Sequence, residues 1–92
     1  MIKSFRHSGI ESFFRNGSKA GIQPKHAKKL SLQLAVLNEA KKASDMNLPG
    51  WYWRPLKGQS AGRWAVSVSG NWRLTYAFES GDAILIDYED YH

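Results

Sequence analysis

The sequence contains no cysteine, and this absence removes several kinds of chemistry at once. Disulfides, thiolate nucleophiles and cysteine-bound zinc sites are excluded, and a chain without disulfides is typical of a reducing compartment. No apolar run approaches the roughly 18 residues of a membrane-spanning helix, and the first residues do not read as a signal peptide. We therefore expect a cytoplasmic protein that does not contact a membrane.

Common motifs for phosphate and metal binding are also missing. The chain has neither a glycine-rich phosphate loop of the P-loop type nor an H-E-x-x-H motif. It has three histidines, at positions that do not build a metal cage: His7, His26 and His92. The acids Asp87, Glu89 and Asp90 could hold a divalent ion, but such acid-rich strand ends are more often simply solvated. We expect no metal and no cofactor.

Charge is unevenly distributed along the chain, which has a formal net charge of +5. Residues 1–73 hold all 13 lysines and arginines and only three acids, whereas residues 74–92 hold five acids and no lysine or arginine. A basic excess of this kind favours a polyanion as partner. The alternative is that the charge serves solubility alone.

Two helices are predicted in the first half. Residues 8–17 begin with a possible capping box between Ser8 and Glu11 and end at Gly17. Residues 24 to about 43 place apolar side chains at helical spacing, with proline at the first helical position. Three lysines occupy the first turns of this second helix: Lys25, Lys28 and Lys29. They form either a solvated face or a contact surface for an acidic partner or RNA backbone.

After residue 50 the hydrophobic period changes from 3.6 to 2. Apolar residues fall on even positions from Trp64 to Phe78, which predicts an antiparallel hairpin turning near residues 69–71, with Arg73 on the opposite face. Three further strands are predicted: a leading edge strand at "IKSF", a strand at "WYWRP" and a last strand over 83–88. The predicted order is β-α-α-β-β-β-β. We expect an α+β fold in which two helices pack on one face of a small, twisted, mostly antiparallel sheet.

The residues alone indicate an RNA-binding sheet, and its open face includes groups of the types that metal-free RNA cleavage would use. That reaction needs a base for the 2′-hydroxyl, a cation for the phosphorane and an acid for the leaving 5′-oxygen. Arg54, Lys57 and Arg73 can supply the cation, and Arg63 follows in the same loop. The last strand delivers the remaining candidates, which are Asp90, Tyr91 and His92. Imidazole exchanges protons near neutral pH, and tyrosine can stack on a base or hydrogen-bond a phosphate.

Four stretches, in order, carry a resemblance to a known family: "MIKSF", "RPLKG", "GNWRLTYAF" and the final "DYEDYH". Over its full length the chain resembles the HigB-type toxins of bacterial toxin–antitoxin modules, within the RelE superfamily. The resemblance implies one RelE-like domain over residues 1–92. It also implies a metal-independent endoribonuclease that cuts messenger RNA in the ribosomal A site and leaves a 2′,3′-cyclic phosphate and a 5′-hydroxyl.

The same resemblance implies partners and residue roles. The partners are the 70S ribosome with its messenger RNA and a helix-turn-helix antitoxin similar to HigA, which would hold a monomeric toxin inactive. Lys57 and Arg73 match the family's phosphate-binding cations, and Asp90, Tyr91 and His92 match its C-terminal functional residues.

One position departs from the family pattern and leaves the general base open. Related sequences often have histidine where this chain has Arg54, and arginine stays protonated at any cellular pH. Arg54 can hold phosphate, so the base is Asp90 or His92, or else catalysis comes mainly from positioning and charge. Two other functions remain alternatives: inhibition of DNA gyrase by a toxin of this fold, and non-catalytic RNA binding.

Overall fold

The structure is a computed structural model that describes residues 1–91. Helices α1 (Ser8–Asn16) and α2 (Ala27–Glu39) come first, followed by strands β1 (Arg54–Pro55), β2 (Trp64–Ser69), β3 (Trp72–Glu79) and β4 (Asp82–Asp90). Three short 3-10 helices connect them: η1 (Pro24–His26), η2 (Ala43–Met46) and η3 (Gly58–Ser60). The strands form one antiparallel sheet in the order β1-β2-β3-β4. The predicted α+β arrangement of two helices before a four-stranded sheet is therefore confirmed.

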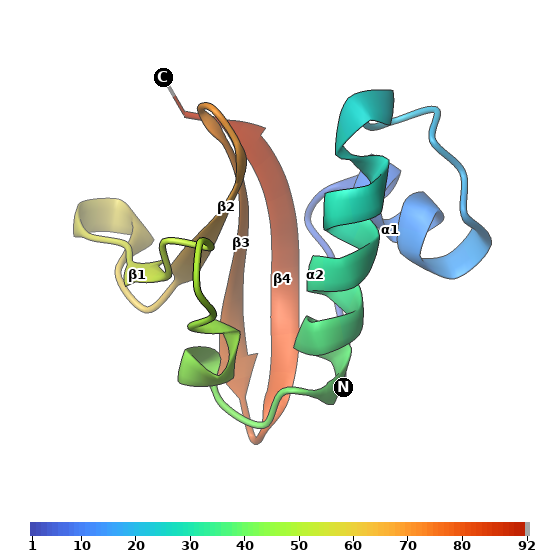
Figure 1. The fold of residues 1–92 in the computed structure, drawn as a ribbon. Coiled ribbons are helices and arrows are strands. Elements are labelled where there is room, and N and C mark those ends of the chain that lie inside the picture. The colour runs from blue at the N-terminus through green and yellow to red at the C-terminus, as the bar shows by residue number, and fades with distance from the viewer. Residues whose placement is uncertain (92) are drawn as a thin grey trace.

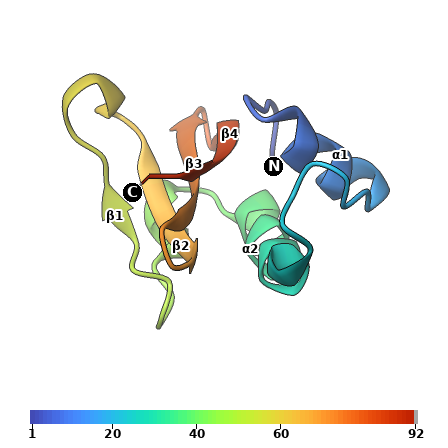
Figure 2. The same ribbon diagram turned by 90° about the horizontal axis from the view of Figure 1, so that it is seen from above.

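Helix α2 covers one face of the sheet, and neither α1 nor α2 covers the opposite face (Figure 1). Seen from above, β1 lies at one edge of the sheet and α1 lies beyond β4 at the other (Figure 2). The core between α2 and the sheet contains these buried side chains: Leu30, Leu34, Leu37, Val66, Leu74, Tyr76 and Ile86. No helix within residues 1–91 is both long and apolar enough to span a membrane.

The hairpin predicted from the alternating pattern is present. Strands β2 and β3 pair from Trp64 opposite Tyr76 to Ser67 opposite Arg73, and the turn falls at residues 70–71. Because successive side chains of a strand point to opposite faces, the even-numbered apolar residues face α2 and Arg73 projects from the other side. This alternation creates the open polar face on which the candidate site lies.

The predicted leading strand is not formed. Ile2 and Phe5 make two isolated parallel bridges to β4, opposite Ala83 and Ile86, with no ladder between them. The reason lies in β4, where the register against β3 shifts and Leu85 adopts a positive φ of 54°. Such a bulge bends the strand, so a straight neighbour cannot pair with it continuously. The hydroxyl of Ser4 accepts the Leu85 N–H instead, at 2.9 Å.

Three predicted boundaries were also wrong. Helix α1 is capped by His7 rather than Ser8, since the His7 Nδ1 accepts the Ile10 N–H at 3.0 Å. Helix α2 ends at Glu39 because Ala40 is extended, with ψ of 146°. Of the predicted "WYWRP" strand only two residues pair, because Tyr52 has a positive φ of 52° and turns the chain before β1.

Two glycines allow the loop before η1 to lie against α1. A Cβ added to Gly9 would come within 2.6 Å of the Gly21 carbonyl oxygen, and one on Gly21 within 2.5 Å of the Gly9 Cα. The atoms that such a Cβ would meet belong to the backbone, which cannot move aside as a flexible side chain could. Any larger residue at either position would therefore separate the loop from α1. This contact fixes the loop that leads to His26, whose role is described below.

Candidate active face

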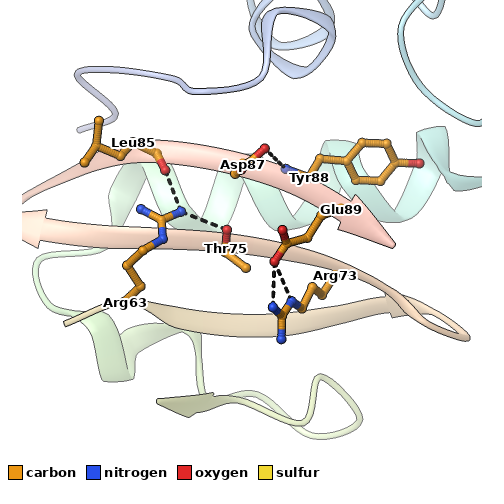
Figure 3. A network of polar contacts seen from close by, with 7 residues as sticks. All are labelled: Arg63, Arg73, Thr75, Leu85, Asp87, Tyr88 and Glu89. Atoms are coloured by element: carbon orange, nitrogen blue, oxygen red, sulfur yellow. Dashed lines mark hydrogen bonds and ion pairs between the residues drawn. The ribbon is translucent and has the colours of Figure 1, made fainter. Parts of the chain in front are cut away.

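The open sheet face carries a charged pair that joins β3 to β4. Arg73 and Glu89 are direct cross-strand partners, and the Arg73 Nε and Nη2 groups both donate to Glu89 Oε1 at 2.7 Å (Figure 3). The Arg73 side chain is 18% exposed and that of Glu89 is 39% exposed. Because a guanidinium has five N–H donors, three are left without a partner within residues 1–91. Arg73 is thus held in place and still has donors to offer.

Tyr91 brings a second guanidinium to the same place. The charged carbon of Arg73 lies 4.5 Å from the centre of the Tyr91 ring, and that of Arg54 lies 5.3 Å from it. Backbone pairing positions the ring, since the Tyr91 N–H donates to the Asn71 carbonyl at 3.1 Å. Cations are attracted to aromatic faces at these distances, so one ring holds two cations that would otherwise repel each other.

Arg54 is attached to the edge of the sheet by its own contacts. Its Nη1 donates to the Tyr52 carbonyl at 3.0 Å and lies 3.5 Å from the Ser67 hydroxyl. Its Nη2 is buried and has no hydrogen-bond partner within residues 1–91. A buried charged donor without an acceptor is costly.

Arg63 lies on this face but is buried, with 8% of its surface exposed. Its Nη2 donates to the Thr75 hydroxyl and to the Leu85 carbonyl, both at 2.8 Å, so it connects the beginning of β2 to the bulge of β4 (Figure 3). Burial, followed by the charge of Arg6, lowers the pKa of Arg63 below that of a free guanidinium. These contacts make Arg63 an internal brace, a side chain that holds the strands together. The predicted phosphate contact of Arg63 stays a prediction.

Replacing Arg63 should therefore act on stability. We expect Arg63→Leu to lower the free energy of unfolding by about 2–3 kcal/mol, because it removes two charged hydrogen bonds and leaves the Leu85 carbonyl without a partner. Urea denaturation measures this directly. The matched control is Arg6→Ala, since Arg6 is an exposed arginine whose positive charge repels that of Arg63. Equal unfolding midpoints for Arg63→Leu and the wild type would contradict the brace.

The other predicted site residues lie close to members of this cluster along the chain. Lys57 is exposed in the loop between β1 and β2, directly before η3. Asp90 ends β4 opposite Trp72, one residue before Tyr91. His92 lies outside the described residues. The structure thus brings together Arg54, Arg73 and Tyr91 from the predicted set, and adds Glu89.

The acidic side chains near the end of β4, which were considered as a metal site from the sequence, make other contacts. Asp87 accepts the N–H of Tyr88 at 2.9 Å, and Glu89 pairs with Arg73. Within residues 1–91 no three histidine or carboxylate side chains gather in a way that could hold a metal ion.

A buried aromatic cluster behind the active face was not predicted. His26 is 2% exposed, and its Nδ1 lies 2.6 Å from the Tyr88 hydroxyl, which also accepts the Gln23 N–H at 3.3 Å. Tyr88 stacks on Trp72 at 4.6 Å, and the edge of His7 packs against it. Trp72 precedes Arg73 and Tyr88 precedes Glu89, so the cluster anchors the two strand ends that carry the charged pair.

The sequence does contain a signal for this cluster. His26 lies four residues before Leu30, and with Leu34 and Leu37 it continues the apolar stripe of α2 to its first turn. A histidine at that point of a buried stripe is expected to lie in the core. Its bonding partner, 62 residues away, could not be read from local spacing.

The His26–Tyr88 contact should make stability depend on pH. Burial lowers the pKa of His26 below 6.5, and Lys25 lowers it further, so the folded protein favours neutral imidazole. The unfolded chain then binds more protons than the folded protein. The contribution of neutral His26 to the free energy of unfolding is therefore complete above about pH 6.5, and it declines as the pH falls toward the pKa of the folded state. We expect His26→Asn, which keeps an acceptor at the δ position, to flatten unfolding midpoints between about pH 5 and 7. Midpoints that depend on pH as steeply in His26→Asn as in the wild type would refute this assignment.

Two comparisons bear on the identity of a small α+β domain with a cationic sheet face. Residues 3–92 match the family described as the RelE-like toxin of type II toxin–antitoxin system HigB. The chain is also 36% identical, over 92 residues and the whole of both chains, to a protein of Proteus vulgaris named Endoribonuclease HigB.

The chain belongs to the HigB-like toxin family, within the RelE-like toxins. A type II toxin implies a cognate antitoxin, and the named relative indicates an endoribonuclease. The family resemblance read from the sequence is therefore confirmed.

Proposed function

We propose that this protein is a toxin that cleaves messenger RNA in the ribosomal A site without a metal ion. The observation that carries the proposal is the Arg54–Tyr91–Arg73 cluster on the open sheet face, in a chain matched end to end by an endoribonuclease. Two fixed guanidinium groups there can neutralise the phosphorane that forms when the 2′-oxygen attacks phosphorus. The folded domain would supply position and charge, and the last residues would supply proton transfer.

The proposed reaction is a transesterification. The 2′-oxygen loses its proton to a base and bonds to phosphorus, the bond from phosphorus to the 5′-oxygen breaks, and an acid returns a proton to that oxygen. The products are a 2′,3′-cyclic phosphate and a 5′-hydroxyl. Arg73 and Lys57 hold the phosphate, while Asp90 and His92 are the candidates for proton transfer.

Arg54 acts in this scheme as a third phosphate ligand, beside Arg73 and Lys57. Since a guanidinium does not lose its proton at cellular pH, it cannot take the proton of the 2′-hydroxyl. Its guanidinium lies near the same Tyr91 ring as that of Arg73, and its fixed donors suit a non-bridging phosphate oxygen. The chain therefore replaces a proton-transfer group by a further positive charge, and the base comes from the Asp90–His92 segment.

The chemistry of the product ends provides the first test. We expect a ribosome-bound message to be cut within the A-site codon, with 5′ ends that need phosphorylation before they can be ligated. Free message should stay intact under the same conditions. Primer extension locates the cut, and ligation with and without prior kinase treatment identifies the ends.

A 2′-deoxy substitution on the nucleotide that precedes the cut is the matched control. It removes the attacking oxygen and leaves the other contacts in place, so cleavage at that codon should stop. Cleavage that persists, or 5′-phosphate ends, would contradict attack by the 2′-hydroxyl. An uncut message in every lane would contradict the endonuclease itself.

A further inference from the structure

Tyr52 is an exposed aromatic residue just before β1, and it was not among the residues predicted for the site. Its exposed fraction is 73%, the largest of any bulky hydrophobic residue within residues 1–91. In that part of the chain its hydroxyl forms no hydrogen bond, and its ring meets neither another ring nor a cation. Isolated exposed rings are common on protein surfaces, so the surroundings of Tyr52 must show whether this one has a function.

The backbone of Tyr52 is strained. Its φ of 52° lies in the left-handed region, which is unfavourable for a residue with a bulky side chain. Two other non-glycine residues within 1–91 have a positive φ: Ser80 between β3 and β4, and Leu85 in the β4 bulge. Glycine would make the turn at Tyr52 without strain. Strain of this kind is concentrated at functional sites, which favours a role for the ring itself.

The two neighbouring tryptophans fix the segment on which Tyr52 lies. Trp51 is 5% exposed and belongs to the hydrophobic core. Trp53 is half-buried, packs against the core and donates from Nε1 to the Tyr76 hydroxyl at 2.9 Å. Tyr52 is held between these two anchors and is the exposed member of the three. Its ring is therefore presented to solvent before any partner binds, and binding to such a pre-formed surface loses little conformational entropy.

Backbone contacts place Tyr52 beside the cations of the active face. Its carbonyl accepts the Arg54 Nη1 group at 3.0 Å. The Ser67 N–H donates to the preceding carbonyl, that of Trp51, at 2.8 Å, and Ser67 lies opposite Arg73 in the ladder of β2 and β3. Since neighbouring strands of a sheet are roughly 5 Å apart, the backbone at Tyr52 lies roughly 10 Å from that of Arg73.

Arg54 is thus bracketed by two exposed tyrosines. The carbonyl of Tyr52 holds its guanidinium on one side, and the ring of Tyr91, which is 46% exposed, lies 5.3 Å from the same group. Proteins that bind single-stranded RNA combine cations that hold phosphates with exposed aromatic rings that stack on bases. A message whose phosphate is held by Arg54 and Arg73 would bring an adjoining base to the neighbourhood of Tyr52.

We propose that Tyr52 is a stacking platform for an unpaired base of the message, next to the phosphate that is cut. The inference rests on the proposed function and adds to it a contact with a base. Stacking uses the π face that every base has, so the contact should hold the message with little preference for sequence. Its role is to align the message against the cations, and it takes no part in proton transfer.

The fluorescence of 2-aminopurine tests the contact without any cleavage. The probe replaces, in turn, each of the two bases that flank the cut phosphate, in a ribosome-bound message made uncleavable by a 2′-deoxy nucleotide before the cut. Stacking on an aromatic ring quenches this base, so saturating wild-type protein should quench it at one of the two positions. Tyr52→Phe keeps the ring and should quench as well. Tyr52→Asn should not, and asparagine is chosen because it tolerates a positive φ.

Cleavage of the ordinary message provides the second measurement. With protein below saturation, Tyr52→Asn should cut about tenfold more slowly than the wild type, which is the effect of losing one stacked base. That difference should disappear on a message with an abasic nucleotide at the quenched position. The matched control is Leu48→Asn, which removes another exposed apolar side chain from the same connector and should quench and cut as the wild type does. Thermal unfolding of each variant checks that the fold is kept.

The outcomes separate this inference from the proposed function. Equal quenching and equal cleavage by the wild type and Tyr52→Asn would overturn the stacking role and leave the endonuclease standing. A slower Tyr52→Asn variant whose deficit is the same on the abasic message would assign the ring to a base of ribosomal RNA, and would also overturn the proposal. A wild-type protein that never cuts the ordinary message would refute the proposed function, whatever the fluorescence shows.

Discussion

Arg73→Ala is expected to lower the rate of A-site cleavage by about 100-fold or more and to leave the protein folded. The magnitude is that of losing one fixed donor to developing negative charge in a site sheltered from water. Arg73 is the cation for which the structure shows the most complete support: Glu89 holds one edge of the guanidinium and Tyr91 lies against it. Single-turnover cleavage of ribosome-bound message measures the effect.

Stability should change little in the same variant. Arg73 projects from the open face and its ion pair with Glu89 is partly exposed, so the pair should contribute about 1 kcal/mol or less. Loss of cleavage with an unfolding midpoint near that of the wild type is the expected combination. If cleavage and the midpoint fell together, the variant would report on folding, and Arg73 would lose its assigned role.

The chain offers a close internal control for this substitution. Arg15 in α1 donates from Nε to Glu11 at 3.0 Å and lies 5.5 Å from the centre of the Phe5 ring. It therefore makes the same two kinds of contact as Arg73, on a part of the molecule far from Tyr91 in the sequence. Arg15→Ala should cut message at the wild-type rate. A comparable loss in both variants would point to general electrostatic attraction to the ribosome.

Arg73→Lys separates charge from geometry at this position. Lysine keeps the positive charge but has no planar fork, so it cannot give two fixed bonds to Glu89 and still present a fixed edge to phosphate. We expect a rate between those of the wild type and Arg73→Ala. Because the Arg73 contacts exist before RNA binds, the loss should appear in the cleavage step as well as in affinity.

The parts of the fold that were predicted correctly are those determined by local pattern. The alternation from Trp64 to Phe78 fixes two paired strands and their faces, because a one-residue slip would expose every core side chain. Gly17 closes α1 with a φ of 76° as its sequence position indicated. The leading strand failed because its partner β4 contains the Leu85 bulge, a backbone feature with no local signature in a run of apolar residues.

The candidate site was predictable in composition and not in detail. The chemistry of Arg54, Arg73 and Tyr91 could be read from residue type and family resemblance, but their shared position depends on the register of β3 against β4. Arg63 shows the limit of the alternating pattern. It lies on the polar face as predicted, and yet it is buried because the bulge turns the Leu85 carbonyl toward it. The alternating pattern predicts on which face of the sheet a side chain lies. Whether that side chain is buried depends on the groups that the neighbouring strands place over it.

Tyr91→Ala is the second substitution expected to have a large effect. Its ring contacts both guanidinium groups, and each such contact is worth roughly 0.5–2 kcal/mol depending on its exposure. We expect cleavage to fall about 10- to 100-fold because Arg54 and Arg73 would repel each other and lose their common position. The fold should persist, since the Tyr91 side chain is 46% exposed and its anchoring bond to Asn71 is made by the backbone.

Tyr91→Phe separates the ring from its hydroxyl. Phenylalanine keeps the aromatic face that holds the two cations, so a purely positioning role predicts cleavage within about threefold of the wild type. If instead the hydroxyl bonds the phosphate in the transition state, Tyr91→Phe should lose about fivefold or more, with the loss in the cleavage rate and little change in affinity. Wild-type rates in both Tyr91→Ala and Tyr91→Phe would remove Tyr91 from the site altogether. The proposed cation cluster would then have to work without the ring that joins its two members.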